Sequence, residues 1–389
     1  MQITDIACHV LLAPDVNTAD TSSAQDSFVV VIRTDEGIEG IGESDVNPWI
    51  ARACIEAPGT HTMGLGVRDM LIGADPRSIE ELWHRLYVGT AMNGRRGALV
   101  HALGAVEMAL WDIKGQAEGK PVFELLGGAQ QETVTPYASL QPDGERWEEY
   151  RDSLCAWAER AKALGFRAVK AEVTMNGPYA HHGMHESYDK HTLTVEAVRK
   201  TLGSDVALMV DVQYMWPDAD TALRTVRDWA GFDVFFLETP IWIDRIGEYA
   251  KLRAAAPMRI AAGEWQATRH EFADFLAHDA LDVLQPDVGR VGGFGEAMAV
   301  CDMARQHAKL IVPHCWKTGV SVTATAHLAF ANANCRFIEY LPPVLCTSVL
   351  RKELASDGFT FADGLVHKPT RPGLGVDLDR DALERFRVA

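Results

Sequence analysis

The sequence has no excess of basic residues. Its 37 Lys and Arg residues stand against 54 Asp and Glu residues, which gives a formal net charge of −17 and a pI near 5.2. Nucleic acids and anionic membrane surfaces both select basic patches, so neither is expected as a partner. No stretch reaches the roughly 18 to 20 apolar residues of a membrane span, and the N-terminus MQITDIACHVLLAPDV lacks a basic segment followed by an apolar run. These absences predict a cytoplasmic protein.

Cysteine is also scarce and scattered. The seven cysteines include no CxxC pair, so the sequence indicates neither a disulfide framework nor a zinc site. No linker rich in Pro, Gly and Ser divides the chain, although 389 residues exceed the roughly 250 to 300 at which a single core stops growing. More than one closely joined domain is therefore expected.

The pattern of apolar and polar residues changes near residue 130. Residues 1–130 begin with strand-like alternation in SFVVVIRTDEGIEGIGES, where DEGIEG reads as a hairpin turn, and continue with long helical patterns. Eight apolar runs then alternate with helical segments: VTPYASL, RAVKAEV, VALMVDV, VFFLETP, RIAAGE, LDVLQPDV, LIVPH and RFIEYL. This alternation predicts an α/β fold in which parallel strands close into a barrel, preceded by an α+β module.

Seven of these runs end in an ionisable residue at the C-terminal side. These residues are Glu172, Asp211, Glu238, Glu264, Asp287, His314 and Glu339. The C-terminal strand ends of a parallel barrel meet at one mouth, where active sites of this architecture lie. Several carboxylates cannot share one mouth unless a cation or protons offset their repulsion.

Three of the carboxylates come from consecutive strands, so their oxygens can converge. Asp211, Glu238 and Glu264 are hard oxygen ligands, which suit Mg²⁺ better than zinc. The alternative is that each carboxylate only caps the helix that follows its strand. Three in series favour metal binding.

His314 and Asp287 end neighbouring strands one barrel step apart. A carboxylate on one imidazole nitrogen fixes the tautomer and raises the basicity of the other nitrogen, which makes a general base. A lone histidine after a proline is more often structural, but the aspartate beside this one favours catalysis.

Taken together, these motifs resemble those of the enolase superfamily and, within it, the mandelate racemase subgroup. MVDVQ, FFLETP and AAGE match the three metal-ligand strand ends, QPD and PH match the Asp and His dyad, and FIEYL matches a glutamate of the eighth strand, here Glu339. The resemblance implies a modified TIM barrel, (β/α)7β, over residues 131–341. It also implies a capping domain built from residues 1–130 and completed by residues 342–389. The implied chemistry is abstraction of the proton α to a carboxylate with Mg²⁺ as cofactor.

One strand departs from the family pattern. Where the racemase has a Lys-x-Lys pair, this sequence reads Lys170, Ala171, Glu172. Lys170 can still donate to the substrate carboxylate or enolate, whereas Glu172 is a poor substitute for a second basic lysine and is expected to pair with Lys170, contact a substrate hydroxyl or act as a weak acid or base. With one strong base, a one-sided reaction is the better interpretation.

The predicted function is therefore dehydration of an acid sugar, an aldonate or aldarate, to a 2-keto-3-deoxy acid. Catalysis is assigned to His314, Asp287, Lys170 and Glu339, and substrate binding to Gln213, Glu172, Lys170 and Glu339. A racemase or epimerase of a 2-hydroxy acid is the alternative, and a non-catalytic binding protein a weaker one.

Substrate choice is expected to depend on loops that face the barrel mouth. Within the family these are cap loops, here around residues 15–27 and 46–66, and the polar loop NGPYAHHGMHESYDKH suits a polyol chain. No arginine-rich second site for a distal carboxylate is evident, which favours a monoacid. Barrels of this family are often homo-oligomers, so a homo-oligomer is expected.

Overall fold

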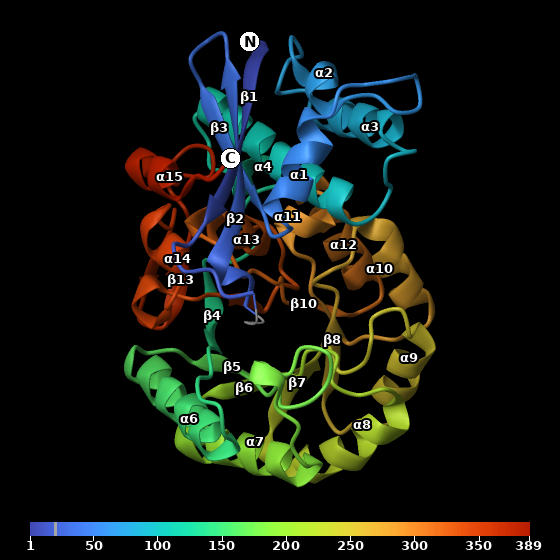
Figure 1. Cartoon of the computed structure of the whole chain (residues 1–389), viewed down its shortest axis with the longest axis vertical. Coiled ribbons are helices and arrows are strands. Elements are labelled where there is room, and N and C mark those ends of the chain that lie inside the picture. Colours follow the sequence, from blue (N-terminus) through green and yellow to red (C-terminus); the bar gives the residue numbers. More distant parts are fainter. Residues whose placement is uncertain (19–21) are drawn as a thin grey trace.

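The computed structural model describes residues 1–18 and 22–389, which form a cap seated on a barrel (Figure 1). The cap begins with an antiparallel sheet of β1 (Ile3–Leu12), β2 (Asp26–Thr34) and β3 (Glu39–Ser44), in the order β1-β2-β3. Gly37 sits in the turn between β2 and β3 with a positive φ of 80°, which glycine adopts without strain. The hairpin read from DEGIEG is therefore present.

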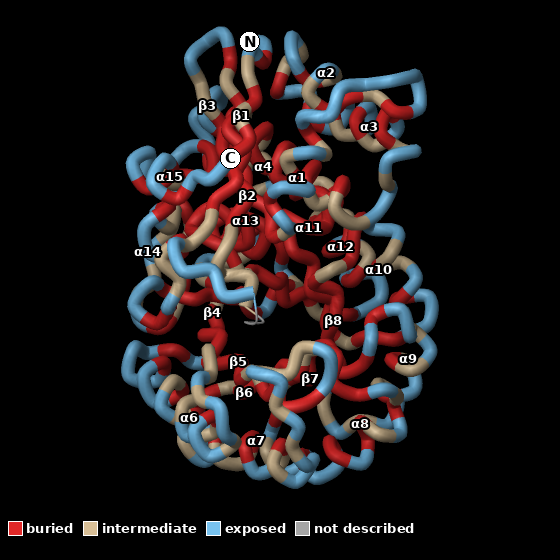
Figure 2. The backbone as a smooth tube through the Cα atoms, viewed as in Figure 1, coloured by how far each residue is buried: buried red, intermediate tan, exposed pale blue. Residues whose placement is uncertain are grey.

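Both faces of the cap sheet are buried, which explains the continuous apolar run of β2. Phe28, Val30 and Ile32 face the helices of the cap, whereas Val29 and Val31 join the large core shared with the barrel. Successive strand residues point to opposite faces, so a strand covered on both sides is apolar throughout. Figure 2 shows this sheet and the barrel strands as buried, with exposed segments on the outer helices.

The cap helices are α1 (Pro48–Glu56), α2 (Val67–Leu71), α3 (Ile79–Gly89), α4 (Ala98–Glu118) and α5 (Val122–Leu125). Helix α4 crosses the sheet at very close range. A side chain at Gly40 or Gly42 of β3 would overlap the backbone carbonyls of Ala109 and Ala105 in α4. The two glycines therefore allow the sheet to carry the long central helix of the cap.

The barrel has eight parallel strands, as the eight apolar runs predict. They are β4 (Thr133–Leu140), β5 (Ala168–Glu172), β6 (Ala207–Asp211), β7 (Val234–Glu238), β8 (Arg259–Ala262), β9 (Val283–Leu284), β10 (Leu310–Ile311) and β11 (Phe337–Glu339). Neighbours in sequence pair from β4 to β10, and β11 pairs with β4. A parallel bridge between Ile311 and Cys335 closes the ring.

Helices surround the barrel on the outside (Figure 1). They are α6 (Trp147–Ala163), α7 (Tyr188–Leu202), α8 (Ala219–Val226), α9 (Ile246–Ala255), α10 (Thr268–Ala277), α11 (Val288–Val291), α12 (Phe294–Gln306) and α13 (Gly319–Phe330). Short 3₁₀ segments lie at η1 (Ser23–Gln25), η2 (His181–Gly183), η3 (Arg227–Phe232) and η4 (Pro343–Leu345). The interior is a packed apolar layer that includes Tyr137, Met209 and Phe236, so the barrel is closed beneath its mouth.

The C-terminal segment divides its contacts between cap and barrel. Helix α14 (Val349–Glu353) follows the last barrel strand, and the hairpin of β12 (Thr360–Ala362) and β13 (Leu365–His367) pairs antiparallel with β4 of the barrel. Helix α15 (Arg380–Phe386) then packs on β1, and Val10 exchanges backbone hydrogen bonds with Val388 and Ala389. The last part of the segment, α15 and residues 387–389, thus reaches the cap sheet.

Carboxylates of the cap bind the N-termini of two barrel helices. Glu43 of β3 accepts a hydrogen bond from the backbone N–H of Ser321 in α13 at 3.0 Å. Glu107 of α4 accepts from the N–H groups of Phe294 and Gly295 in α12 at 2.7 and 2.9 Å. Helix N-termini carry unpaired N–H groups and partial positive charge, which these buried carboxylates satisfy.

The described ranges 1–18 and 22–389 contain no helix that is both long and apolar enough to cross a bilayer.

Candidate active site

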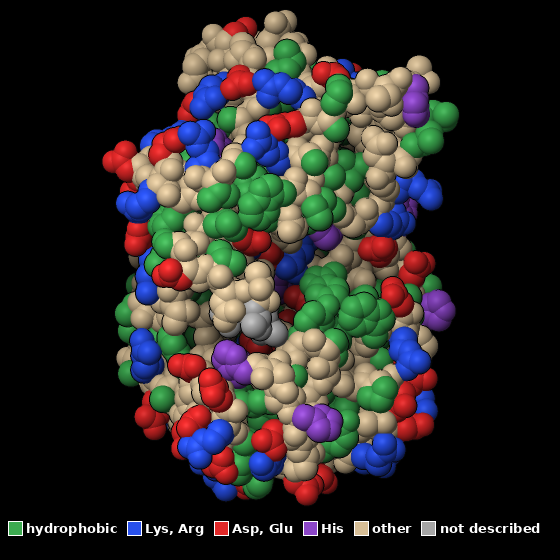
Figure 3. Space-filling view, viewed as in Figure 1, with side chains coloured by type: hydrophobic (Ala, Val, Ile, Leu, Met, Phe, Trp, Pro, Cys, Tyr) green, Lys and Arg blue, Asp and Glu red, His purple; other side chains and the backbone are tan. Residues whose placement is uncertain are grey.

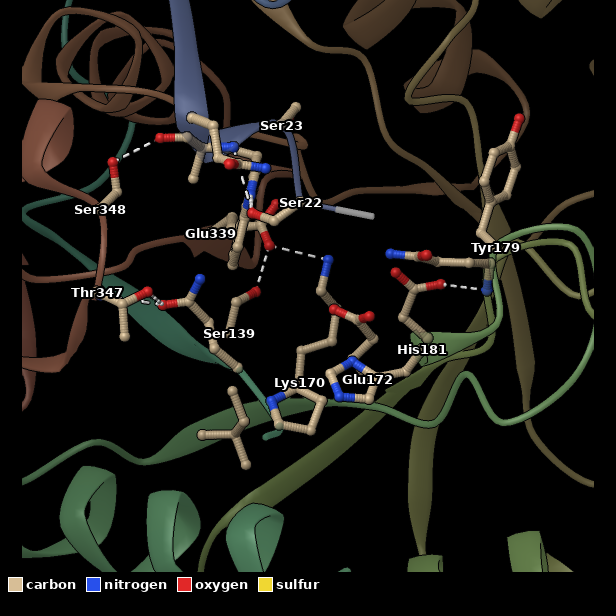
Figure 4. Close-up of a pocket in the computed structure, with 18 of the residues that line it drawn as sticks. Ser22, Ser23, Ser139, Lys170, Glu172, Tyr179, His181, Glu339, Thr347 and Ser348 are labelled. Atoms are coloured by element: carbon tan, nitrogen blue, oxygen red, sulfur yellow. Dashed lines mark hydrogen bonds and ion pairs between the residues drawn. The ribbon is translucent and has the colours of Figure 1, made fainter. Parts of the chain in front are cut away.

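The side chains predicted to carry the chemistry gather around one cavity of about 600 Å³ between barrel and cap. Its wall contains Lys170, Glu172, Asp211, Gln213, Glu264, His314 and Glu339. Strand register sets Glu172 beside Asp211 and Asp211 beside Glu238, while Glu238 and Asp287 lie buried behind the wall. Figure 3 shows the hollow between the two parts of the molecule, and Figure 4 shows the interior of the cavity.

Lys170 on β5 is a buried cation at the floor of the cavity. Its Nζ lies 2.9 Å from Oε1 of Glu238 and 2.9 Å from Oε1 of Glu339. The ammonium also lies 5.4 Å from the ring centroid of Tyr137. Burial lowers the pKa of Lys170, but the charges of Glu238 and Glu339 outweigh burial and hold that pKa well above its usual value. Because an ammonium group has three N–H donors, one remains for a molecule in the cavity.

Glu339 on β11 is held as a carboxylate. It accepts hydrogen bonds from the Ser139 hydroxyl and from the backbone N–H of Cys315 at 2.9 Å, and it forms an ion pair with Lys170. Burial raises the pKa of Glu339, but the charges of Lys170 and His314 hold it below its usual value. The Ser139, Lys170 and Glu339 contacts are visible in Figure 4.

Asp211 is positioned by backbone in unusual conformations. It accepts a hydrogen bond from Thr239 Oγ1 at 2.7 Å and one from the N–H of Gln213 at 2.9 Å. Thr239 has φ of 44° and Gln213 has φ of 41°. A β-branched residue rarely adopts a positive φ, and such strain concentrates at functional sites. The chain after β6 and β7 is thus bent in a way that orients Asp211.

The other two predicted metal ligands also have protein partners. The second oxygen of Glu238 accepts a hydrogen bond from Gln285 Nε2 at 2.7 Å, and the side-chain oxygen of Gln285 is buried with no hydrogen-bond partner among the described residues. Glu264 accepts a hydrogen bond from the Tyr214 hydroxyl at 2.9 Å. Its other oxygen lies 3.5 Å from Arg290.

Across the described ranges, no group of three or more His, Cys, Asp or Glu side chains is arranged to hold a metal ion. Lys170 and Gln285 each donate a hydrogen bond to one oxygen of Glu238. The donors nevertheless fit a hard cation. Burial and neighbouring carboxylates raise the pKa of both Asp211 and Glu238 against the opposing charge of Lys170, so a cation bound among these oxygens would favour their charged forms. Metal binding by the three carboxylates stays a prediction.

His314 and Asp287 form the predicted pair. Nδ1 of His314 donates to Asp287 Oδ2 at 2.7 Å, which directs Nε2 into the cavity. Burial lowers the pKa of His314, but the hydrogen bond to Asp287 and the charges of Glu339 and Glu264 raise it to about 9. Asp287 also accepts hydrogen bonds from the N–H groups of residues 289 and 290 and so caps α11. The same carboxylate therefore both caps a helix and orients His314.

Glu172 lies in the cavity wall but forms no ion pair with Lys170, whose partners are Glu238 and Glu339. The pairing of Glu172 with Lys170, one of the three roles that the sequence suggested for Glu172, is therefore not present. Glu172 accepts instead a hydrogen bond from Thr174 Oγ1 at 3.1 Å. Burial and the charge of Asp211 raise the pKa of Glu172 to about 7. Figure 4 shows Glu172 next to Lys170 and open to the cavity.

Two further charged residues, one in the cavity wall and one outside it, were not predicted from the sequence. Arg290 lines the cavity, and its guanidinium is bound by Asp45 of the cap and by the backbone oxygen of Glu264. Lys317 lies 3.0 Å from the other oxygen of Asp45. Burial raises the pKa of Asp45, but Arg290 and Lys317 outweigh it and lower that pKa to about 2. Because Arg290 follows Asp287 by three positions, the sequence could have indicated that it lies near the site. Nothing in the sequence indicates that it pairs with Asp45.

The two predicted cap loops behave differently. Residues 15 and 22–25 line the cavity, and residues 19–21 of the same loop lie outside the described residues. None of residues 46–66 lines it, because α1 instead buries Ala51 and Ile55 against β1, β2 and α4. In the long loop after β5, His181 and His182 line the cavity, while His191 is buried at the start of α7.

A closed eight-stranded barrel with acidic strand ends, a His–Asp pair and a fused α+β cap defines a class of barrel enzymes. Two family models cover nearly the whole chain. Residues 3–127 match the mandelate racemase/muconate lactonizing enzyme N-terminal domain, and residues 153–382 match the enolase C-terminal domain-like family. The chain belongs to the mandelate racemase/muconate lactonizing enzyme family of the enolase superfamily and is an enzyme of that superfamily.

Similar proteins carry several activities in their names. D-galactarolactone cycloisomerase of Agrobacterium fabrum is 30% identical over 100% of this chain and 99% of its own length. D-galactonate dehydratase of Ralstonia nicotianae is 30% identical over 92% of this chain and 90% of its own length. The crystal structure of 3,6-anhydro-D-galactonate cycloisomerase from Zobellia galactanivorans superimposes with a TM-score of 0.87 at 26% identity and covers 100% of both chains.

Proposed function

We propose that the protein is a Mg²⁺-dependent dehydratase of an acid sugar. The observation that carries the proposal is the asymmetry of the cavity. One wall holds a histidine with an aspartate partner, and the strand that carries a second basic lysine in the racemase holds Glu172 instead. Relatives named D-galactonate dehydratase and arabinonate dehydratase support the reaction class.

The reaction begins at Nε2 of His314. This nitrogen removes the proton from the carbon α to the substrate carboxylate. Meanwhile the Nδ1–H group of His314 remains hydrogen-bonded to Asp287. The α-carbon and β-carbon then form a double bond as the β-hydroxyl leaves. The hydroxyl takes the proton from His314 and departs as water, and the resulting enol rearranges to the 2-keto-3-deoxy acid. One histidine serves both steps, so atoms and protons balance without a second base.

His314 must be neutral to accept the proton. Glu264 lies 3.2 Å from Nε2 and is one of the charges that raise the pKa of His314. Offsetting the charge of Glu264 therefore lowers this pKa towards neutral pH.

Charge that develops on the substrate carboxylate faces Lys170. The ammonium is already buried and fixed by Glu238 and Glu339, so it needs no reorganisation during the reaction. Asp211, Glu238 and Glu264 are the residues that would hold Mg²⁺, which when bound supplies the further positive charge that so weak a carbon acid requires. Gln213 lies in the same wall, and its proposed role is to hydrogen-bond the substrate carboxylate or a hydroxyl.

Cycloisomerisation is the second candidate, because relatives of that name align over the full chain. On a lactone, the same proton abstraction would expel a ring oxygen instead of a hydroxyl and give an isomer. Epimerisation would need a working base on the Glu172 side of the cavity.

The deciding experiment incubates the protein and Mg²⁺ with aldonic acids, aldaric acids and their lactones in D₂O. A product lighter by one water that reacts as a 2-keto acid is expected, and the His314→Asn variant should give none. An isomeric ring-opened product would replace the proposal with cycloisomerisation. An inverted epimer with deuterium at the α-carbon would replace it with epimerisation.

The expected setting is the cytoplasm, with a small sugar acid as partner, no nucleic acid or membrane partner, and a homo-oligomeric assembly. All seven cysteines are free, which supports a reducing compartment.

A further inference from the structure

One side of the cavity is lined by uncharged hydroxyl and amide groups that the proposed chemistry does not use. We call this set the hydroxyl wall: Ser22, Ser23, Gln141, Thr347 and Ser348. Its members come from three separate segments, namely the cap loop around η1, the end of β4 and the turn before α14. Figure 4 shows Thr347 and Ser348 on the side of the cavity away from Tyr179 and His181.

Hydrogen bonds fix these segments to one another. Ser348 Oγ donates to the backbone oxygen of Ala24 at 2.6 Å, and Trp316 Nε1 donates to Ser22 Oγ at 3.2 Å. The backbone N–H and the hydroxyl of Thr347 both lie 3.3 Å from the side-chain oxygen of Gln141 and donate to it. The wall is therefore a built surface and not a set of loose loop residues.

This arrangement leaves donors for a ligand. With the oxygen of Gln141 taken by Thr347, the two N–H groups of its Nε2 have no partner among residues 1–18 and 22–389. The Ser22 hydroxyl accepts two hydrogen bonds there but donates none. Neutral N–H and O–H donors match the hydroxyl oxygens of a polyol.

Charge around the wall disfavours a carboxylate. Among residues 1–18 and 22–389, the cavity lining near the wall includes Asp15 and Asp143 but neither Lys nor Arg. Lys317, which donates to the backbone oxygen of Ser23 from outside the lining, is already paired with Asp26 and Asp45. The two strong cations of the cavity are already engaged, Lys170 by Glu238 and Glu339, and Arg290 by Asp45. A second substrate carboxylate that moved from water to this wall would find no countercharge there. The free-energy cost of this transfer is far larger than that of moving a hydroxyl group.

We propose that the hydroxyl wall receives the uncharged end of the substrate, with Gln141 as its principal donor, so that the enzyme acts on aldonates in preference to aldarates. The inference rests on the proposed function and narrows it to one class of acid sugar. It assigns specificity to residues that touch neither the reacting carbon nor the carboxylates of the floor.

The first test compares each aldonate with the aldarate of the same configuration, using the full chain with Mg²⁺. The aldonate is expected to have a kcat/KM higher by about 30-fold or more, the scale of leaving one charged group without a partner. A Gln141→Arg variant supplies the missing cation, and its ratio of aldarate to aldonate turnover should rise by about 10-fold or more.

The second test pairs a variant with an altered substrate. Replacing the terminal hydroxyl of the aldonate by hydrogen should lower the kcat/KM of the wild type by about 10-fold, mainly through KM. Gln141→Leu should turn over both compounds equally, because it has no donor to lose. Gln306→Leu, at an exposed position of α12, is the matched control and should keep the wild-type ratio.

The outcomes separate the two proposals. Equal or faster turnover of the aldarate by the wild type, or an unchanged preference for the terminal hydroxyl in Gln141→Leu, would overturn the inference while the dehydratase proposal stands. Loss of water from no acid at all would overturn the dehydratase proposal. Calorimetric affinities of the same compounds would then still decide whether the hydroxyl wall selects an uncharged end.

Discussion

Replacing Lys170 by Met tests the electrostatic core of the site most directly. The substitution keeps the length and most of the apolar volume of the side chain but removes a buried cation that is 2.9 Å from each of two buried carboxylates. Glu238 and Glu339 would then face each other and Asp211 without compensation. The variant should therefore lose both stability and activity.

The expected magnitudes follow from this geometry. Removing one partner of a buried ion pair typically costs about 3 to 5 kcal/mol, because the remaining charge stays buried. Removing one preorganised donor to a developing oxyanion costs about 10² to 10³ in kcat. The stability loss should be partly reversed in Lys170→Met/Glu339→Gln, since the neutral amide no longer needs a countercharge.

Urea unfolding in the presence of EDTA measures the stability term without interference from a metal. Lys251→Met serves as the control, because Lys251 pairs with Asp220 on the surface and its loss should leave the unfolding midpoint unchanged. If Lys170→Met unfolds at the same urea concentration as the wild type, the carboxylates are not held by this lysine. The electrostatic description of the floor would then be wrong.

Four further predictions address other groups. Glu238→Gln should weaken Mg²⁺ binding, as measured by calorimetry, and leave little turnover, because an amide is a poorer ligand for a hard cation. Full activity of the wild type after exhaustive EDTA treatment would contradict metal dependence. His314→Asn should abolish loss of water while substrate affinity is retained, and Asp287→Asn should be milder but still damaging; near wild-type turnover in His314→Asn would place the base elsewhere. Glu172→Gln should lower kcat/KM by less than about 10-fold, and substrate recovered from D₂O should keep its configuration; recovery of the inverted epimer would reveal a base at Glu172. Burial raises the pKa of Glu107 from 4.5 to about 7, so the native state keeps a proton that the unfolded chain loses, and stability should fall by about 3 kcal/mol as pH rises from 4.5 to 7. The Glu107→Gln variant should show a flatter pH profile in urea unfolding, and an identical slope would refute this assignment.

The barrel could be predicted from the sequence because its strands are buried on both sides. Such strands read as short apolar runs, and their C-terminal ends converge by topology alone. Topology therefore predicts that residues as distant as Glu172 and Glu339 share one mouth, and both line the cavity. The pairing of His314 with Asp287 follows from the same rule, since β9 and β10 are neighbours.

Contacts between the cap and the barrel could not be read in this way. Asp45 binds Arg290 across 245 positions of sequence, and no periodic pattern links them. That residues 46–66 lie outside the cavity lining could not be predicted either, because helical amphipathicity shows that α1 buries one face but not against which element. The ion-pair partners of Lys170 were likewise missed, since two side chains on one face of a strand can each turn to neighbouring strands.

The carboxylates of Glu43 and Glu107 have a consequence for how such enzymes diversify. Each belongs to the cap but completes the first turn of a barrel helix, so a cap taken from another protein would have to bring an acidic group to the same two points. Loops at the rim of the cavity are not subject to this requirement. New specificities should therefore arise by changing rim residues within an intact chain, and recombination of whole caps between distant relatives should yield proteins whose barrels fold poorly.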